Sequence, residues 1–99
     1  IVRFIRAPEV APLRVDFAFI MPRPQAHYTK PTKKRPGTAL RDDAPHYHTK
    51  KPDRTKLMRS TEDALTGVIW ADDTLIVAGE TTKIYGEKPG CHITITPLL

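Results

Sequence analysis

The stretch 13–20 reads LRVDFAFI and alternates apolar with more polar residues along its whole length. Side chains of an extended chain point alternately to its two faces, so every second residue shares a face. One face is wholly apolar and carries Leu13, Val15, Phe17 and Phe19. The other face carries Arg14, Asp16 and Ala18. The stretch therefore predicts a half-buried strand at the centre of a small core.

The chain has 99 residues, which suffices for one domain with a small core. Ten prolines against five glycines, with most prolines in the first half, indicate an irregular stretch beside a compact part. Residues 21–52 show neither helical nor strand periodicity, so we expect a long basic, Pro-rich loop there. The first residue is Ile1 rather than Met, which is consistent with a fragment or an incomplete gene prediction.

The charge balance is basic, with 16 Lys and Arg against 11 Asp and Glu and a formal net charge of +5. This charge favours a polyanionic partner, nucleic acid first, while a plain solvated surface would have the same composition. A single cysteine, Cys91, excludes an internal disulfide and a multi-thiolate zinc site. No apolar run approaches the roughly 20 residues of a membrane span and no signal peptide is recognisable, so a cytosolic protein is expected.

Residues 54–66 predict an amphipathic helix that is closed by Gly67. The expected buried sector consists of Leu57, Met58, Thr61, Ala64 and Leu65, and the opposite sector of Lys56, Arg59 and Asp63. Residues 74–85 predict a strand that weakens or bulges at Gly79, residues 87–90 a turn, and residues 91–96 a final strand. We find no internal repeat.

Acidic residues stand before and after the predicted helix. Asp53 is placed as its N-cap, which leaves one carboxylate oxygen free, and Asp72 and Asp73 precede the next strand. If that strand runs back alongside the helix, Asp53 and Asp73 could together bind magnesium, which prefers oxygen ligands. Asp63 is excluded as a partner of Asp53, because ten residues of helix span about 15 Å. Two acids at this spacing are by themselves a weak signal.

The order of several residues along the chain resembles that of the RusA family of Holliday-junction resolvases. The matching residues are Asp53, Lys56-Leu57, Arg59, Asp63-Ala64-Leu65-Thr66-Gly67, Trp70, Asp72-Asp73, Ile76-Val77 and Lys83. The upstream PRPQAHY and APHYHTKKPD resemble the loop of the phage branch of the family. The resemblance covers residues 13–95. It implies a single RusA-like α+β domain, with a small mixed sheet, a helix packed on it, and a homodimer.

The resemblance also implies a function, namely a magnesium-dependent endodeoxyribonuclease that resolves four-way DNA junctions in recombination, repair or phage DNA processing. Manganese is an alternative metal, and a bacterial cytoplasm, with a phage or prophage origin, is the implied location. Asp53 and Asp73 would hold the metal, with Asp72 as a secondary candidate. Arg59 would bind the scissile phosphate, and Lys56 could do the same work.

The chain departs from the family pattern at two places. Thr55 occupies the position of a second family Asp, and a neutral hydroxyl is a poorer magnesium ligand. The alternative is therefore a cleavage-deficient protein that binds junctions, and a weaker third possibility is a truncated relic with neither activity. The family's N-terminal strand and helix also appear reduced to IVRFIRAPEVAP, which predicts low stability unless a dimer covers the exposed edge.

Basic and histidine side chains outside the acidic motif are candidates for DNA contacts. They are Lys33, Lys34, Arg35, His46, His48, Lys50, Lys51, Lys56 and Lys83. The spacing of His27, His46, His48 and His92 matches no familiar zinc motif. Trp70, Phe17 and Phe19 are expected in the core rather than as platforms for base stacking.

Overall fold

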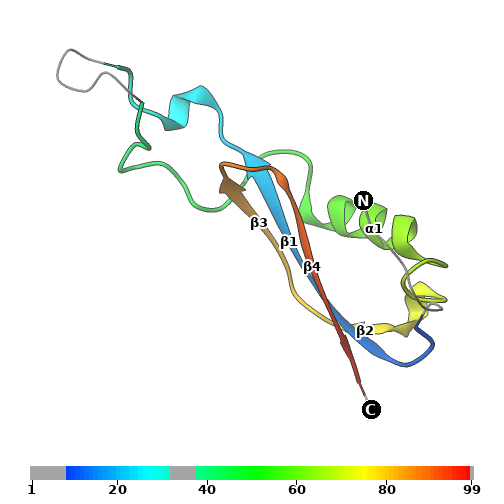
Figure 1. Ribbon diagram of the computed structural model, residues 1–99. Coiled ribbons are helices and arrows are strands. Elements are labelled where there is room, and N and C mark those ends of the chain that lie inside the picture. Colours follow the sequence, from blue (N-terminus) through cyan, green and yellow to red (C-terminus); the bar gives the residue numbers. More distant parts are fainter. Residues whose placement is uncertain (1–8, 32–37, 99) are drawn as a thin grey trace.

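The computed structural model describes residues 9–31 and 38–98 and has the expected α+β fold, a four-stranded sheet with a helix against one face (Figure 1). The strands are β1 (Leu13–Pro22), β2 (Ile76–Ala78), β3 (Thr81–Gly86) and β4 (Gly90–Pro97). The helix α1 spans Arg54–Leu65, and two short 3-10 turns are η1 (Gln25–His27) and η2 (Asp73–Leu75). Residues 1–8 are outside the described ranges, so the expectation about a missing N-terminal strand and helix lies outside the described residues.

Strand β1 lies at the centre of the sheet. On one side β4 pairs with it antiparallel, from Leu13↔Pro97 to Ile20↔Gly90. On the other side β2 and β3 follow one another along the same edge, both parallel to β1. Among the described strands β1 is thus the one with neighbours on both edges, as Figure 1 shows.

The core confirms the alternation read in β1. Leu13, Val15, Phe17 and Phe19 are buried together with Trp70. Leu57, Met58 and Leu65 of α1 pack against this cluster. The rings of Phe17 and Phe19 stack with centroids 5.7 Å apart. The expected core positions of Trp70, Phe17 and Phe19 are therefore confirmed, whereas Ala64 is exposed and was wrongly placed in the buried sector.

The predicted N-cap of α1 is also confirmed. The Oδ1 atom of Asp53 accepts a hydrogen bond from the Lys56 N–H at 2.9 Å. The helix ends at Leu65, one residue earlier than expected, because the extended backbone of Thr66 terminates it. Gly67 follows with φ +82, a conformation that glycine adopts without strain.

The strand expected over residues 74–85 is interrupted where Gly79 crosses β1. A Cβ atom on Gly79 would lie 1.8 Å from the carbonyl oxygen of Val15, and its φ is +144. The chain pairs with β1 again at the next residue, Glu80. Its N–H donates to Asp16 Oδ1 at 2.9 Å, and its carbonyl oxygen accepts from the Phe17 N–H at 2.9 Å. The Glu80 N–H and then the Arg14 guanidinium lower the pKa of Asp16.

The segment 23–51 is termed the arm, and its described residues, 23–31 and 38–51, extend from one end of the sheet (Figure 1). The molecule measures 59 × 26 × 21 Å, and its radius of gyration of 17.8 Å exceeds the roughly 13 Å of a compact chain of this size. The expected loop is less irregular than predicted. Tyr28 pairs with Leu40 inside the arm, and Tyr47 pairs with Ile84 of β3, where the arm returns to the sheet.

Replacing Gly79 with alanine should destabilise the protein by at least about 2 kcal/mol, because the added methyl group meets the Val15 backbone as well as an unfavourable φ. Gly67→Ala is the matched control: its φ is also positive, but the added Cβ would meet nothing within 4 Å. Chemical denaturation of both variants measures the difference. Equal losses of stability would contradict a close approach of the two strands.

Candidate metal and DNA-binding site

Asp53 stands exposed at the start of α1, where the arm ends. One carboxylate oxygen caps the helix, and the other has no hydrogen-bond partner among the described residues. The chain just before Asp53 is held by Lys83 of β3, whose Nζ donates to the carbonyl oxygens of Lys50 and Pro52, both at 2.8 Å. Asp53 therefore combines a fixed backbone with a carboxylate oxygen available to a ligand.

Thr55 is exposed and lines a hollow of about 420 Å³ between α1 and the connection from β2 to β3. The hollow is closed on one side by Arg54, whose Nη1 donates to the Thr81 carbonyl at 3.4 Å. The hydroxyl of Thr55 brings no charge to this position. The structure thus places the departure from the family pattern at the surface, where a larger side chain would fit.

Asp72 and Asp73 lie beyond the other end of α1. Asp72 Oδ1 accepts a hydrogen bond from Thr74 N–H at 3.0 Å, and this N–H lowers the pKa of Asp72. Asp73 lies near Glu62 of α1. Partial burial raises the pKa of Glu62, and the negative charges of Asp73 and Asp63 raise it further.

Glu62 was not among the site residues predicted from the sequence. This residue belongs to the half-buried side of α1, three positions after Arg59, whose positive charge partly offsets the rise in its pKa. The helical spacing from Arg59 was the available signal. The proximity to Asp73 could not be read from the sequence, because it depends on how the chain returns after Trp70.

The helix separates the two acids that were expected to share a metal ion. Glu62 lies nine positions after Asp53, which corresponds to about 14 Å along the helix, and Asp73 lies at the Glu62 end. The chain after Asp73 does run back beside α1, as the strands β2 and β3. Asp72 and Asp73 precede these strands, so they remain near the Glu62 end of the helix. Over residues 9–31 and 38–98, no group of three or more His, Cys, Asp or Glu side chains is arranged to hold a metal ion.

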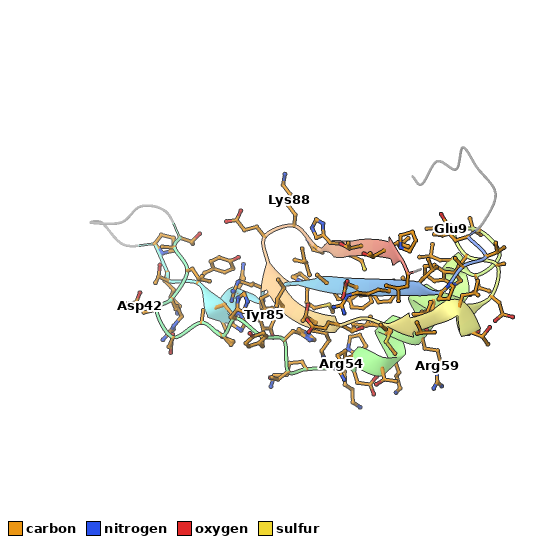
Figure 2. The ribbon with its side chains drawn as sticks, turned by 90° about the horizontal axis from the view of Figure 1, so that it is seen from below. Glu9, Asp42, Arg54, Arg59, Tyr85 and Lys88 are labelled. Atoms are coloured by element: carbon orange, nitrogen blue, oxygen red, sulfur yellow. The ribbon has the colours of Figure 1, made fainter. Side chains whose placement is uncertain are left out.

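The charges on α1 run against its dipole. Arg54, Lys56 and Arg59 occupy the N-terminal half, and Glu62 and Asp63 the C-terminal half. In the first or last turn, where all of these residues except Arg59 lie, such a placement costs on the order of 0.3–1 kcal/mol in helix stability at an exposed position. Arg54 and Arg59 project away from the sheet (Figure 2). The arrangement does not stabilise the helix, and it presents one anion-attracting end and one cation-attracting end.

The remaining candidate DNA contacts fall into three groups. Lys50, Lys51, Lys56 and His46 are exposed. Lys33, Lys34 and Arg35 lie outside the described residues. Lys83 is half-buried with its ammonium group on backbone carbonyls. The roles of all these residues in DNA binding stay predictions.

His48 is buried rather than exposed. Its ring lies 5.0 Å from that of Tyr85, and the ring of His27 lies 4.7 Å from the same tyrosine. Burial and then the charge of Lys83 lower the pKa of His48. The guanidinium of Arg23 lies over the Tyr85 ring at 5.2 Å. His27 and His48 therefore pack around Tyr85. Tyr85 lies at the base of the arm (Figure 2).

The arm carries the positive charge of the chain. Eight of the 16 Lys and Arg lie in residues 23–51, against two of the 11 Asp and Glu. The arm thus has a formal charge of +6 and the remainder of the chain −1. Sequence-independent attraction to phosphates is consequently expected to reside mainly in the arm.

The chain matches a known protein family. The family model described as "Endodeoxyribonuclease RusA" matches residues 4–96. No curated protein and no solved structure matches the chain. Across the part of the chain that the structure describes, no helix is long and apolar enough to cross a membrane.

Glu62→Gln should stabilise the protein at neutral pH and leave its stability nearly unchanged near pH 4. The raised pKa means that the folded state holds its proton more tightly than the unfolded chain, so the native charge becomes unfavourable as the pH rises above about 4.5. Thermal melting at both pH values tests this, with Glu87→Gln in the exposed turn after β3 as control. A larger gain at pH 4 than at pH 7 would show that the sign is wrong.

Proposed function

The chain belongs to the RusA family of Holliday-junction endodeoxyribonucleases, and we propose that it resolves four-way DNA junctions by magnesium-dependent hydrolysis of phosphodiester bonds. The family match over residues 4–96 is the observation that carries this proposal. The geometry adds a surface with separate anion-attracting and cation-attracting regions, which suits a DNA backbone held beside a metal ion.

The acidic side chains fit a hard divalent cation. Asp53 has a carboxylate oxygen without a partner among residues 9–31 and 38–98. The like charges of Glu62 and Asp73 repel one another, and a cation would relieve this repulsion. Asp53 and Asp73 are the proposed ligands, with Asp72 as the secondary candidate. When bound, magnesium neutralises charge on the scissile phosphate and makes a coordinated water more acidic.

A homodimer reconciles these ligands with the fold. Because α1 separates Asp53 from Asp73 within one chain, we place the two carboxylates of one ion on different protomers. Two-fold symmetry then generates two equivalent sites, one for each of the two strands that must be cut in a junction. Manganese would satisfy the same oxygen ligands.

The proposed contacts with DNA phosphates come from the basic residues. Arg59 and Lys56, on the exposed side of α1, would bind the scissile phosphate and offset its charge. The arm would follow neighbouring phosphates through Lys50, Lys51 and its other cations. His46, which is exposed beside β3, would add a further contact. These contacts orient the strand and carry little sequence preference.

The second candidate function is that of a junction-binding protein without cleavage. Thr55 favours it, because a neutral hydroxyl stands where the family has a carboxylate. In this case the arm and the basic half of α1 would still bind DNA. The two candidates therefore differ in the cutting step rather than in affinity.

Incubating the purified chain with a labelled four-way junction should give paired symmetric nicks that require magnesium. Asp73→Asn should lower the cutting rate more than about 100-fold, because loss of a metal ligand removes several kcal/mol of transition-state stabilisation. Asp63→Asn, exposed on the same helix as Arg59, is the control for loss of one negative charge. Salt-sensitive binding without nicks would favour the junction-binding protein instead.

Thr55→Asp should raise magnesium-dependent cutting by about tenfold or more, since it restores a carboxylate beside Asp53. Thr55→Asn has nearly the same shape without the charge and should give no such gain. Single-turnover rates on the same junction measure the effect. An unchanged rate in Thr55→Asp would count against the enzyme.

A further inference from the structure

We propose that Lys83 is a positioning residue, which fixes the backbone ahead of Asp53 and thereby orients the Asp53 carboxylate. This role differs from the phosphate contact expected from the sequence. Its catalytic consequence rests on the proposed nuclease function, whereas its structural part does not.

The side chain of Lys83 lies on the α1 side of the sheet, because Lys83 pairs with the core residue Phe19. Its Nζ donates to the carbonyls of Lys50 and Pro52, both at 2.8 Å. Pro52 immediately precedes Asp53 in the sequence. A bond from an ionised donor is roughly twice as strong as one between neutral groups.

Lys83 also holds the preceding part of the same segment through its backbone. Its carbonyl oxygen accepts from the His48 N–H at 3.1 Å, and two residues further along β3 the Tyr85 N–H donates to the His46 carbonyl at 2.9 Å. The segment 46–52 is therefore attached to β3 at both ends. It links the base of the arm to the first residue of α1.

Between these attachments the segment has little else to hold it. In the described parts of the chain, the two bonds from Lys83 Nζ are the hydrogen bonds that fix residues 49–52. Thr49, Lys50, Lys51 and Pro52 are all exposed, so apolar packing contributes little. Loss of the ammonium group would consequently free the backbone that sets the direction of Asp53.

The charge of Lys83 has no carboxylate partner among the described ion pairs. It lies near the positive end of the α1 dipole and lowers the pKa of His48. A cation in this place is electrostatically unfavourable for the fold, and the two carbonyls are what offset it. The geometry thus favours a positioning role for Lys83 over a mere contribution to the surface charge.

The test compares Lys83→Met, which keeps the length and apolar stem, with Lys88→Met. Lys88 carries the same charge at the exposed turn after β3 and points away from the sheet (Figure 2). Hydrogen exchange of the Lys56 N–H reports on its bond to Asp53 and needs no activity. Single-turnover cutting at saturating junction and the salt dependence of binding complete the comparison.

Lys83→Met should speed exchange of the Lys56 N–H and lower the saturated cutting rate, each by about tenfold or more, with the salt dependence unchanged. Lys88→Met should leave exchange and the cutting rate as they are, and Lys83→Arg, which keeps donors and charge, should restore much of both. Wild-type exchange and cutting in Lys83→Met, with a salt slope reduced by about 0.9, would identify a phosphate contact and overturn the proposal.

Two further outcomes stay decisive. If the parent chain does not cut junctions, the proposed function fails, while hydrogen exchange of Lys56 still decides the position of Asp53. If Lys83→Met does not fold, Lys83→Gln takes its place, since its amide can reach one carbonyl at most. Exchange of the Lys56 N–H as slow as in the parent chain would then overturn the proposal.

Discussion

The structure depends on the pairing of β1 along both of its edges. This strand supplies Leu13, Val15, Phe17 and Phe19 to the core, and each fully buried side chain of this size contributes roughly 1.5–3 kcal/mol. A sheet this small is stable only when it has three or more strands and a helix on its apolar face. Both requirements are met through β1, which pairs with β2, β3 and β4 and carries the apolar residues against which α1 packs.

Because β3 is paired with β1, it has a fixed position and can in turn hold the arm and the start of α1. Its residues hold the base of the arm at Tyr85 and the start of α1 at Lys83. The helix then places Asp53 at one end and Glu62 near Asp73 at the other. The same interactions that build the fold therefore separate the basic and acidic parts of the surface along one helix.

Local chemistry explains which features could be predicted from the sequence. The alternation in β1, the cap by Asp53 and the interruption at Gly79 depend on neighbouring residues, and all three are found. Other features depend on the path of the chain in space. They are the proximity of Glu62 to Asp73, the burial of His48 and the bonds from Lys83 to Lys50 and Pro52. The same is true of the distance between Asp53 and Asp73. The positions of Asp53 and Asp73 gave only a weak signal for a shared metal site, which resemblance to a family strengthened, and the geometry could not be inferred from spacing.

The central claim is the proposal that a magnesium ion is bound by Asp53 of one protomer and Asp73 of another. Its most direct test is to mix the variants Asp53→Asn and Asp73→Asn, let the subunits exchange, and measure junction cutting against the parent chain. Each variant alone should be inactive, and random exchange should restore about a quarter of the sites, because half of the dimers are mixed and each has one intact site. A mixture as inactive as the separate variants, with exchange verified, would contradict the claim.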